Sequence, residues 1–286
     1  MKKTINIILA AILILALASC NSGTFDTSKT ITVISREDGS GTRGAFIELF
    51  AIEQKNDDGT RKDLTTKEAI IAKQTDVMMT NVSGDMYAIG YTSLGSLNDT
   101  IKAVQIEGVK ATADNVKNGT YPIMREFNIA TKGEPSGITK DFIDFILSGD
   151  GQIIAAQSYV PVNENAAAYP GNTPAGKIVI AGSSSVSPLM EKLIEAYKII
   201  NPDAVIELQT NDSSSGMNAA MDGTCHIGMA SRELKDNEKA VLTDVTIALD
   251  GIAVIVNKDN PISNLTKDQV KGIFTGNTLK WSDVTE

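Results

Sequence analysis

The sequence predicts an α/β protein in which helices cover mixed β-sheets and the chain is organised as two lobes. Short apolar segments typical of strands alternate with segments of helical periodicity, which is the pattern of this fold class. A stretch rich in Gly, Pro, Asn and Ala, residues 163–176, interrupts the alternation as a linker or long surface loop, and the pattern restarts after it. The residues that follow the first 20 of the 286 are long for one hydrophobic core and suit two lobes.

In the first half of the chain, strands and helices are expected to alternate. Four segments with strand-like composition or alternation are predicted as strands: 30–35, 87–91, 101–106 and 121–130. Four segments with helical periodicity are predicted as helices: 42–53, 67–80, 138–147 and 152–156. Residues 54–66 are polar and contain Asp57-Asp58-Gly59, so a loop is expected there.

The second half repeats this alternation. Four apolar segments are predicted as strands: 176–181, 205–208, 225–230 and 247–257. Ser187 and Pro188 are expected to open a helix that ends at Asn201-Pro202, because Ser caps helices and Pro suits their first turn. The buried stripe of that helix is predicted to be Leu189, Leu193, Tyr197 and Ile200. Further helices are expected after Gly216, from Ser231, and from the capping box Thr266-x-x-Gln269 to near Gly276.

The first 20 residues have the features of a signal peptide. Lys2 and Lys3 precede an apolar run, residues 7–18, that is shorter than the ~20 residues of a membrane-spanning helix. The run closes in Leu17-Ala18-Ser19-Cys20, which resembles a bacterial lipobox; the alternative is an ordinary signal peptide with an incidental Cys. The resemblance implies a lipoprotein whose Cys20 carries acyl chains such as palmitate and anchors it to the extracytoplasmic face of the cell membrane.

The charge of the chain argues against nucleic acid as a partner. The formal net charge is −9, and it becomes −11 once the two positive charges of Lys2 and Lys3 are subtracted. The sequence has no basic runs and only 5% aromatic residues, so no nucleic-acid surface is expected. A pocket for an anion would have to overcome this negative field locally, through oriented N–H groups and a positioned Arg.

Cysteine and histidine are too few for most hydrolase chemistry. If Cys20 carries lipid, Cys225 has no partner for an intrachain disulfide, and its apolar setting predicts a core residue. His226 is the only His, and neighbours on a strand point to opposite faces, so neither a Cys–His pair nor a Ser–His–Asp triad is expected. No cluster of metal ligands is present in the sequence. We therefore expect neither an enzyme nor a bound metal or cofactor.

Four loops share a design that favours anions. In each, a predicted strand ends, residues rich in Ser, Thr and Gly follow, and a helix begins: 36–42, 182–187, 212–216 and Ser231-Arg232. Helix N-termini present unpaired N–H groups and about half a positive charge, so several of them facing one point would bind an anion. The alternatives are ordinary helix capping by Ser or Thr and, for Arg36 and Asp38, a surface ion pair.

Gly39-x-Gly41-x-x-Gly44 also fits the dinucleotide-binding fingerprint. That fold requires a second strand and an acidic residue about 20 residues further on, where this chain has a polar segment without strand character. A Gly-Lys-[Ser/Thr] phosphate loop is absent as well. Nucleotide binding is therefore not expected.

Seven stretches resemble the phosphate-binding proteins of ABC phosphate importers. The signature of that family, R-x-D-G-S-G-T, is matched by Arg36-Glu-Asp38-Gly-Ser40-Gly41-Thr42. Six other stretches are similar to further parts of the family: 88–95 (AIGYTSLG), 116–123 (VKNGTYPI), 181–197 (AGSSSVSPLMEKLIEAY), 228–234 (GMASREL), 248–261 (ALDGIAVIVNKDNP) and 273–284 (IFTGNTLKWSDV).

The order of these stretches departs from the family. In the usual member the GSSSVSP-type segment comes first, and R-x-D-G-S-G-T follows the KWSDV-type segment. The chain therefore resembles a circularly permuted member, with residues 163–176 joining the former ends. The alternative is a gene fragment spanning two tandem copies. A cut is tolerated where it falls in an exposed connection.

The resemblance implies a type II periplasmic-binding-protein clamshell. Its lobes are expected to be a split lobe, residues 29–100 plus 254–286, and a continuous lobe, residues 101–253. The ligand would lie between them, and closure of the hinge would bring both sets of loops onto it.

The resemblance also assigns ligand contacts. Arg36 would give charge-assisted hydrogen bonds to phosphate, each contributing ~1.5–3 kcal/mol. Asp38 would orient Arg36. The other positions expected to donate to the anion are Ser40, Gly41, Thr42, Ser184, Ser185, Ser213 and Ser231. Some members have an Asp where this chain has Ser231, and that Asp accepts the proton of hydrogen phosphate and repels sulfate. Asp38 is then the remaining candidate for this role. Because Ser213, Ser214 and Ser215 are consecutive, the residue matched to the family's contact could shift by one position from Ser213.

The leading functional interpretation is a lipid-anchored binding protein. It captures inorganic phosphate and delivers it to the permease and ATPase subunits of an ABC importer. Three alternatives stay open: another oxyanion (sulfate, molybdate or tungstate) on the same fold, a sensor that reports phosphate to a partner, and an enzyme acting on phosphate esters. The last is disfavoured by the lone His and the missing metal ligands.

Overall fold

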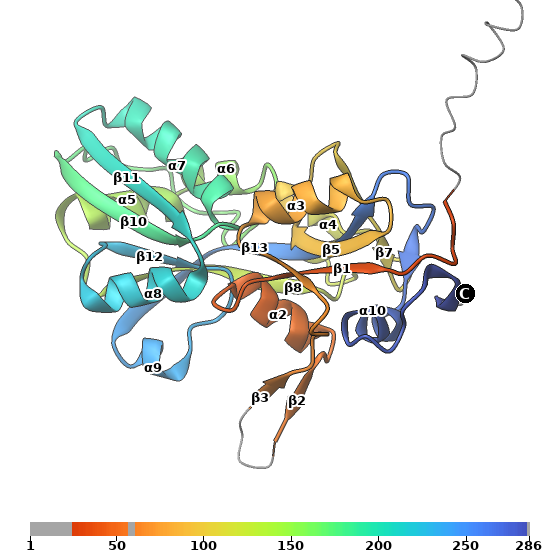
Figure 1. Ribbon diagram of the computed structural model, residues 1–286. Coiled ribbons are helices and arrows are strands. Elements are labelled where there is room, and N and C mark those ends of the chain that lie inside the picture. Colours follow the sequence, from red (N-terminus) through yellow and green to blue (C-terminus); the bar gives the residue numbers. More distant parts are fainter. Residues whose placement is uncertain (1–24, 57–60, 285–286) are drawn as a thin grey trace, which may run out of the picture.

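The structure is a computed structural model that describes residues 25–56 and 61–284. The predicted signal peptide and Cys20 lie outside the described residues. Figure 1 shows two lobes side by side, and ten of the described strands form one mixed sheet that runs through both. Between residues 25 and 284, leaving out 57–60, no helix is both long and apolar enough to cross a membrane. The predicted α/β class with mixed sheets is confirmed.

One lobe, here called the Arg36 lobe, comprises residues 25–56, 61–123 and 252–284. Its central strand lies parallel to a neighbour on each side: β1 (Thr32–Arg36), between β4 (Ile70–Ala72) and β5 (Ala88–Ser93). Its helices are α2 (Gly41–Leu49), α3 (Thr75–Gly84), α4 (Ala113–Lys117) and α10 (Lys267–Phe274), with 3-10 turns η1 (Leu94–Ser96) and η2 (Trp281–Asp283). Short strands complete it: β6 (Ile101–Ala103), β7 (Gln105–Ile106) and β14 (Asn264–Leu265).

The other lobe, here called the serine lobe, comprises residues 124–251. Its sheet has β10 (Gly176–Ser183) parallel to both β11 (Ala204–Asn211) and β12 (Ile227–Ala230), and the short strand β9 (Val160–Pro161) at its border. Its helices are α5 (Gly137–Leu147), α6 (Gly149–Ala155), α7 (Ser187–Ile200), α8 (Ser213–Asp222) and α9 (Asp236–Lys239). α7 buries Leu189, Leu193 and Tyr197 as predicted, but Ile200 is exposed.

Two antiparallel strands connect the lobes: β8 (Met124–Lys132) and β13 (Leu242–Asn257). β13 pairs with β8 as far as Gly251 and then with β5 from Ile252 onward. The same strand therefore belongs to the serine lobe at its start and to the Arg36 lobe at its end. Figure 1 shows β13 and β8 running between the two halves of the molecule.

Each lobe has its own hydrophobic core, and the cores place the boundary differently from the prediction. The core of the Arg36 lobe includes Ile101, Val104 and Tyr121 together with residues from both ends of the chain, and Val160 of β9 packs with it from the serine lobe. Residues 101–123, expected in the continuous lobe, therefore pack with the split lobe. The second boundary lies at 251/252, close to the predicted 253/254. Local sequence patterns do not tell which of two cores a strand joins, and that is the origin of the difference.

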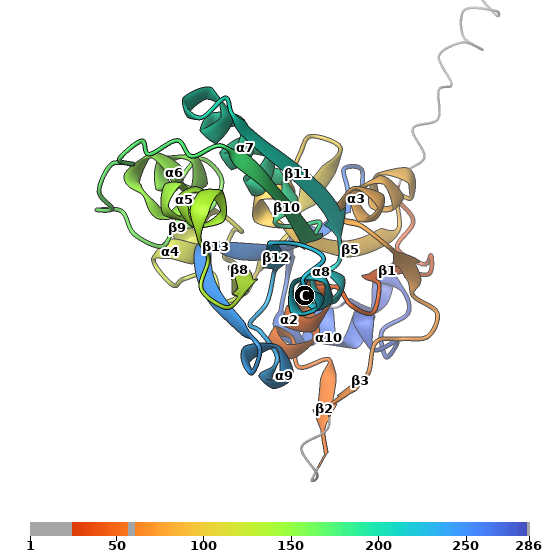
Figure 2. The same cartoon turned by 90° about the vertical axis from the view of Figure 1, so that its left-hand side faces the viewer.

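The polar segment 54–66 was expected to be a loop, but its described part forms a hairpin. β2 (Glu53–Lys55) and β3 (Arg61–Asp63) are antiparallel and project from the body of the protein (Figure 2). Its polar side chains pair with one another and with α2: Arg61 Nη1 lies 2.8 Å from Glu53 Oε1, and Arg43 Nη2 lies 2.8 Å from Asp63 Oδ2. Because the hairpin is held by charges, it lacks the apolar alternation by which strands are predicted.

Several predicted helix starts are corrected by the capping that the structure shows. The segment 67–80 divides into β4 and α3. Ser187 is the first residue of α7 and donates to the Ser183 carbonyl (3.2 Å), while Val186 is the N-cap. α8 begins at Ser213, ahead of Gly216, because Asp212 Oδ1 accepts from Ser215 N (2.9 Å). Ser231 does not begin a helix; α9 starts only at Asp236.

The two ends of the described chain lie side by side. Ile31 N donates to Leu279 O (2.8 Å), and Ser282 N donates to Thr27 O (2.7 Å). The predicted linker, 163–176, has no helix or strand before β10 begins and runs along the serine lobe. Gly149 N donates to Ala167 O (2.7 Å), which fastens the linker to the start of α6.

The capping box predicted for α10 is present and gives a stability test. Thr266 Oγ1 accepts from Gln269 N (3.1 Å), and Gln269 Oε1 accepts from Thr266 N (2.7 Å). We expect Thr266→Ala to lower the free energy of unfolding by ~1 kcal/mol, because Ala offers the helix no acceptor. Urea denaturation of the two proteins measures this change. Ser263→Ala, at an exposed position just before β14, should change stability by less than about 0.5 kcal/mol. Equal losses in both variants would contradict the capping role.

Candidate functional site

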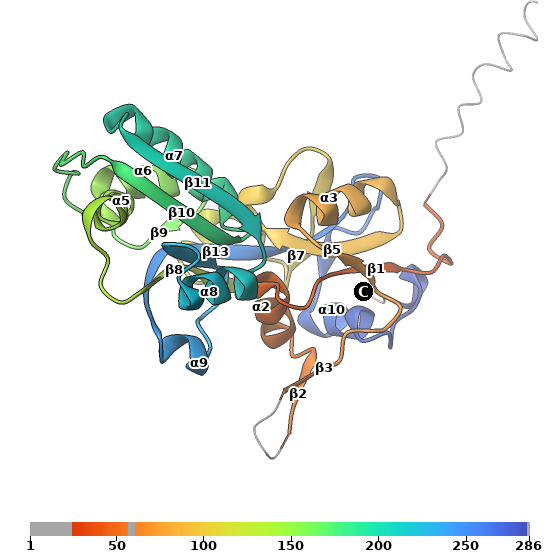
Figure 3. The ribbon, with the colours of Figure 1, turned by 60° about the vertical axis from the view of Figure 1, so that its left-hand side comes forward.

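The predicted anion loops meet where the two lobes touch. Arg36 ends β1, and the N-terminus of α2 follows it with Ser40 as N-cap. From the serine lobe come the residues after β10, the N-terminus of α8, and Ser231 directly after β12. Figure 3 shows α8 and α2 next to each other at this junction. Ser214 N donates to Gly39 O (3.2 Å) across it.

Arg36 is the cation of the site, and its side chain is held from several directions. Its Nε donates to Glu37 Oε2 (2.8 Å) and its Nη2 to Glu37 Oε1 (2.7 Å). Nη1 also donates to Thr75 Oγ1 (3.2 Å), and Nη2 to Ser184 Oγ (3.1 Å). These bonds fix the direction of the guanidinium. Only 2% of Arg36 is exposed, so the charge is also almost fully buried.

The backbone of Arg36 is fixed by a buried tyrosine. Arg36 N donates to Tyr91 Oη (3.0 Å), and that hydroxyl lies 3.0 Å from Ser35 Oγ. Burial raises the pKa of Tyr91 above its ordinary value, so the phenol stays neutral. The ring stacks on Phe46 of α2, with 3.9 Å between the centroids. β1, β5 and α2 thus jointly position the residue that carries the charge.

Hydroxyl groups from both lobes surround the guanidinium. Thr42 Oγ1 and Ser185 Oγ lie 2.8 Å apart, and Thr75 Oγ1 lies 3.1 Å from Ser184 Oγ and 3.2 Å from Ser185 Oγ. Thr42 and Thr75 belong to the Arg36 lobe, whereas the serines belong to the other. This part of the contact between the lobes is therefore made by groups that can each donate or accept a hydrogen bond.

A second hydroxyl cluster lies beside the first residue of α2. Ser183 Oγ donates to Ser231 Oγ (2.9 Å), and Ser231 N donates to Ser213 Oγ (3.1 Å). Ser213 and Ser231 are both fully buried. A Cβ at Gly41 would come within 2.4 Å of Ser213 Oγ and 2.8 Å of Ser231 Oγ, so only Gly allows this approach.

The structure corrects the role predicted for Asp38. Its side chain is fully exposed, and its Oδ1 pairs with Arg43 Nη1 (2.8 Å), not with Arg36. The chain turns into Gly39 (φ +81°) directly after Asp38, which directs that carboxylate to solvent. Glu37 orients Arg36 instead. In the described part of the chain, the hydrogen bonds found for the site hydroxyls include none to a carboxylate.

Three residues of the site were missed by sequence reasoning: Glu37, Thr75 and Ser183. Glu37 is adjacent to Arg36 inside the signature, but the signature favours Asp38. Thr75 falls inside a predicted helix, whereas it is the first residue of α3 and its hydroxyl contacts the other lobe. The recognisable signal for Thr75 was Gln74-Thr75-Asp76, a helix start with an acidic first turn.

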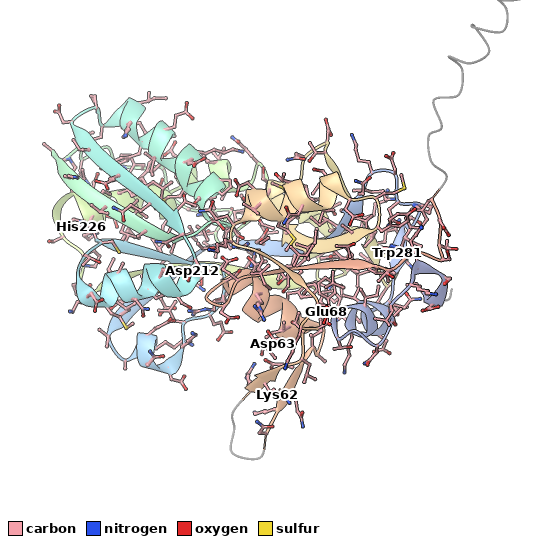
Figure 4. The ribbon with its side chains drawn as sticks, viewed as in Figure 1. Lys62, Asp63, Glu68, Asp212, His226 and Trp281 are labelled. Carbon is pink, nitrogen blue, oxygen red and sulfur yellow. The ribbon has the colours of Figure 1, made fainter. Side chains whose placement is uncertain are left out.

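Cys225 and His226 lie apart from the site, and neither belongs to the strand predicted for 225–230, because β12 begins only at Ile227. Cys225 is buried, whereas His226 is exposed and its Nδ1 accepts from Val179 N (3.0 Å). Figure 4 shows His226 at the outer edge of the serine lobe, away from Asp212 at the junction. Over the described residues, no group of three or more His, Cys, Asp or Glu is placed to hold a metal ion.

Burial makes Cys225 a poor nucleophile, which can be tested directly. Burial raises the pKa of its thiol to about 11, so roughly one thiol in a thousand is ionised at pH 8. The protein starting at residue 21 has Cys225 as its only thiol. We expect iodoacetamide at pH 8 to leave this protein unmodified when it is folded and to modify it in urea. Intact-mass measurement distinguishes the two. Rapid modification of the native protein would show that Cys225 is accessible.

Comparisons with known proteins agree with this architecture. A family model described as a PBP superfamily domain matches residues 21–150 and 167–286. The phosphate-binding protein PstS 2 of Streptococcus agalactiae serotype V is 52% identical over 94% of this chain and 93% of its own length. PstS 2 of Streptococcus pneumoniae serotype 4 is 45% identical over 90% and 88%, respectively. The crystal structure of a phosphate-binding protein of a phosphate ABC transporter from S. pneumoniae gives a TM-score of 0.71 at 44% identity, covering 90% of this chain and 100% of that one.

Two lobes joined by crossing strands, with polar loops meeting at their junction, define a binding protein of the two-lobed periplasmic class. The similarity over nearly the whole length is more specific, and the chain belongs to the PstS family of phosphate-binding proteins. The predicted family resemblance is confirmed. The names of these relatives describe binding proteins and not enzymes, in agreement with the expectation for this chain.

Proposed function

We propose that this protein binds inorganic phosphate between its lobes and delivers it to the permease and ATPase subunits of an ABC importer. The names of its relatives support this proposal, since they are phosphate-binding proteins and one belongs to a phosphate ABC transporter. Anchoring through an acylated Cys20 on the extracytoplasmic face of the cell membrane is part of the same proposal and rests on the lipobox-like sequence.

The observation that carries the proposal is the contact of Arg36 with hydroxyls of both lobes. Arg36 bonds Thr75 of its own lobe and Ser184 of the other through the edge of the guanidinium that Glu37 leaves open. A tetrahedral oxyanion between these groups would accept several hydrogen bonds at once, where the hydroxyls now bond one another. Charge-assisted bonds of this kind contribute ~1.5–3 kcal/mol each.

The remaining predicted contacts follow from the same placement. Donors from the Arg36 lobe would be Ser40, Gly41 and Thr42 at the start of α2. Donors from the serine lobe would be Ser184, Ser185, Ser213 and Ser231. Because these two sets lie on different lobes, the anion would enter when the lobes part and would hold them together once bound.

Sulfate is the anion to compare with phosphate. Discrimination between the two requires an acceptor for the proton of hydrogen phosphate, and the carboxylate expected to serve, Asp38, faces solvent beside Arg43. The other carboxylate described at the site, Glu37, has both oxygens bonded to Arg36, so hydroxyl oxygens and backbone carbonyls are the acceptors left for that proton. This placement favours weaker rejection of sulfate than a carboxylate would give.

We also infer that the element order is that of a circularly permuted family member. Permutation requires the new ends to be adjacent and the former ends to be joined by an exposed connection. The contacts of Thr27 and Ile31 with Ser282 and Leu279 satisfy the first requirement. Residues 163–175, which have no regular structure and lie on the serine lobe, satisfy the second.

Isothermal titration of the protein starting at residue 21 tests the function. We expect tight binding of phosphate at neutral pH and at least a hundredfold rise in Kd for Arg36→Ala, which corresponds to about 2.7 kcal/mol. Asp38→Asn is the matched control and should bind as the native protein does. Circular dichroism verifies that each variant is folded.

Each result of the titration has a distinct meaning. Unchanged affinity in Arg36→Ala would overturn the site. Equal binding of sulfate and phosphate would keep the site and remove the selectivity for phosphate. Loss of binding in Asp38→Asn would restore that carboxylate to the site, and a folded protein that binds neither anion would refute the proposed function.

The lipid anchor has its own test. We expect Cys20→Ser, expressed in a bacterium that acylates lipoproteins, to yield a protein without acyl chains that partitions into the aqueous phase of a detergent extraction. The unsubstituted protein should partition into the detergent phase, because two acyl chains suffice for stable anchoring. Mass spectrometry of the N-terminal peptide identifies the modification. A Cys20→Ser protein that is still acylated would exclude the lipobox.

A further inference from the structure

A buried ion pair lies where the sheet passes from one lobe to the other. Arg125 on β8 and Asp250 on β13 are directly opposite in the antiparallel register. Arg125 Nε and Nη2 donate to Asp250 Oδ2 at 3.1 and 2.9 Å. Their side chains are 3% and 0% exposed, so this pair has almost no contact with water.

Each member of the pair also holds one lobe. Asp250 Oδ1 accepts from Ser93 Oγ (2.9 Å) and from Leu94 N (3.1 Å), at the end of β5 in the Arg36 lobe. Arg125 Nη1 donates to the carbonyl oxygen of Ser231 (3.1 Å), in the loop of the serine lobe that carries a predicted anion contact. A continuous chain of bonds therefore runs from Ser231 through Arg125 and Asp250 to Ser93.

The pair occupies the point about which the lobes would turn. β13 stops pairing with β8 at Gly251 and begins to pair with β5 at Ile252, immediately after Asp250. Rotation of one lobe against the other must be taken up by backbone near this change of partner. The guanidinium also lies over the ring of Phe127, 5.2 Å from its centroid, which limits its freedom.

A buried ion pair generally adds little to the free energy of unfolding. The cost of removing two charges from water is often as large as their attraction, and an apolar pair of similar volume can be as stable. What an apolar pair could not do is bond Ser231 on one side and Ser93 on the other with fixed geometry. The arrangement therefore points to positioning.

We propose that Arg125 and Asp250 are positioning residues that fix the Ser231 loop relative to the Arg36 lobe and so define the closed arrangement of the site. Neither residue touches the anion in this proposal. The affinity test of this proposal rests on the proposed function, because it measures binding of phosphate. The measurement of the distance between the lobes does not depend on that function.

The test compares Arg125→Met, Arg125→Lys and Asp250→Asn with a matched control. The control is Asp141→Asn, at a buried carboxylate of α5 that accepts from Tyr197 Oη (2.6 Å) and from Tyr169, within the serine lobe and away from the crossing strands. Urea denaturation gives the loss of stability in every variant. The control thereby separates general destabilisation from an effect on the site.

Titration with phosphate is the first readout. We expect Kd to rise at least tenfold in Arg125→Met and in Asp250→Asn, and to recover in part in Arg125→Lys, whose ammonium can reach one partner of the guanidinium. Asp141→Asn should keep Kd within twofold of the native value. A folded Arg125→Met with native affinity, or an equal loss of affinity in the control, would overturn the proposal.

The separation of the lobes is the second readout and does not depend on the ligand. Spin labels at Lys192→Cys on α7 and Asp268→Cys on α10, both exposed, report the distance between the lobes. We expect one narrow distribution in the native protein with phosphate, and a broader one in Arg125→Met and Asp250→Asn with or without it. If the native protein binds no phosphate, the proposed function fails, and identical distributions in native and variant proteins would still refute the positioning role. If Arg125→Met does not fold, Arg125→Lys and Asp250→Asn decide the question.

Discussion

The burial of the Arg36 guanidinium is the constraint on which the architecture of the site depends. A cation this far from water is tolerated only when its N–H groups are bonded and its charge is compensated. Glu37 supplies the charge, Thr75 and Ser184 supply acceptors, and Tyr91 fixes the backbone. Because Ser184 comes from the other lobe, the surroundings of Arg36 are complete only while the lobes are in contact. Local folding and the relative position of the lobes are thereby linked through one side chain.

The compensation of Arg36 by Glu37 has an electrostatic consequence for any anion that binds. The pair has no net charge, and the protein as a whole carries −9. Beyond the direct hydrogen bonds of Arg36, attraction would come from dipoles directed at the junction, namely the N-termini of α2 and α8 and the hydroxyls beside them. Dipoles act over a short range, so selectivity in such a site depends on the fit of donors around the ligand more than on long-range attraction.

Much of this arrangement was predictable from sequence because it follows from local rules. Three of the four predicted strand–loop–helix units, the capping box of α10 and the stripe of α7 through Tyr197 follow from local composition and periodicity, whereas no helix begins at Ser231. Glu37 and Asp38 could not be told apart, since the direction of a side chain in a tight turn depends on backbone angles that the sequence does not state. The hairpin β2–β3 was not predicted because its side chains form ion pairs such as Arg61–Glu53 and not the alternating apolar contacts by which strands are recognised. The assignment of residues 101–123 to a core required knowledge of long-range packing.

The proximity of the N-terminal end of the described chain to the Arg36 lobe bears on how the molecule would move on a membrane. Phe25 packs against the core of that lobe, and four residues lie between it and Cys20, so the two Cα atoms are at most about 18 Å apart in an extended chain. If Cys20 is acylated as proposed, the tether restrains one lobe within that reach of the bilayer. The serine lobe has no such restraint. Opening would then move the serine lobe, while the Arg36 lobe stays near the surface of the bilayer.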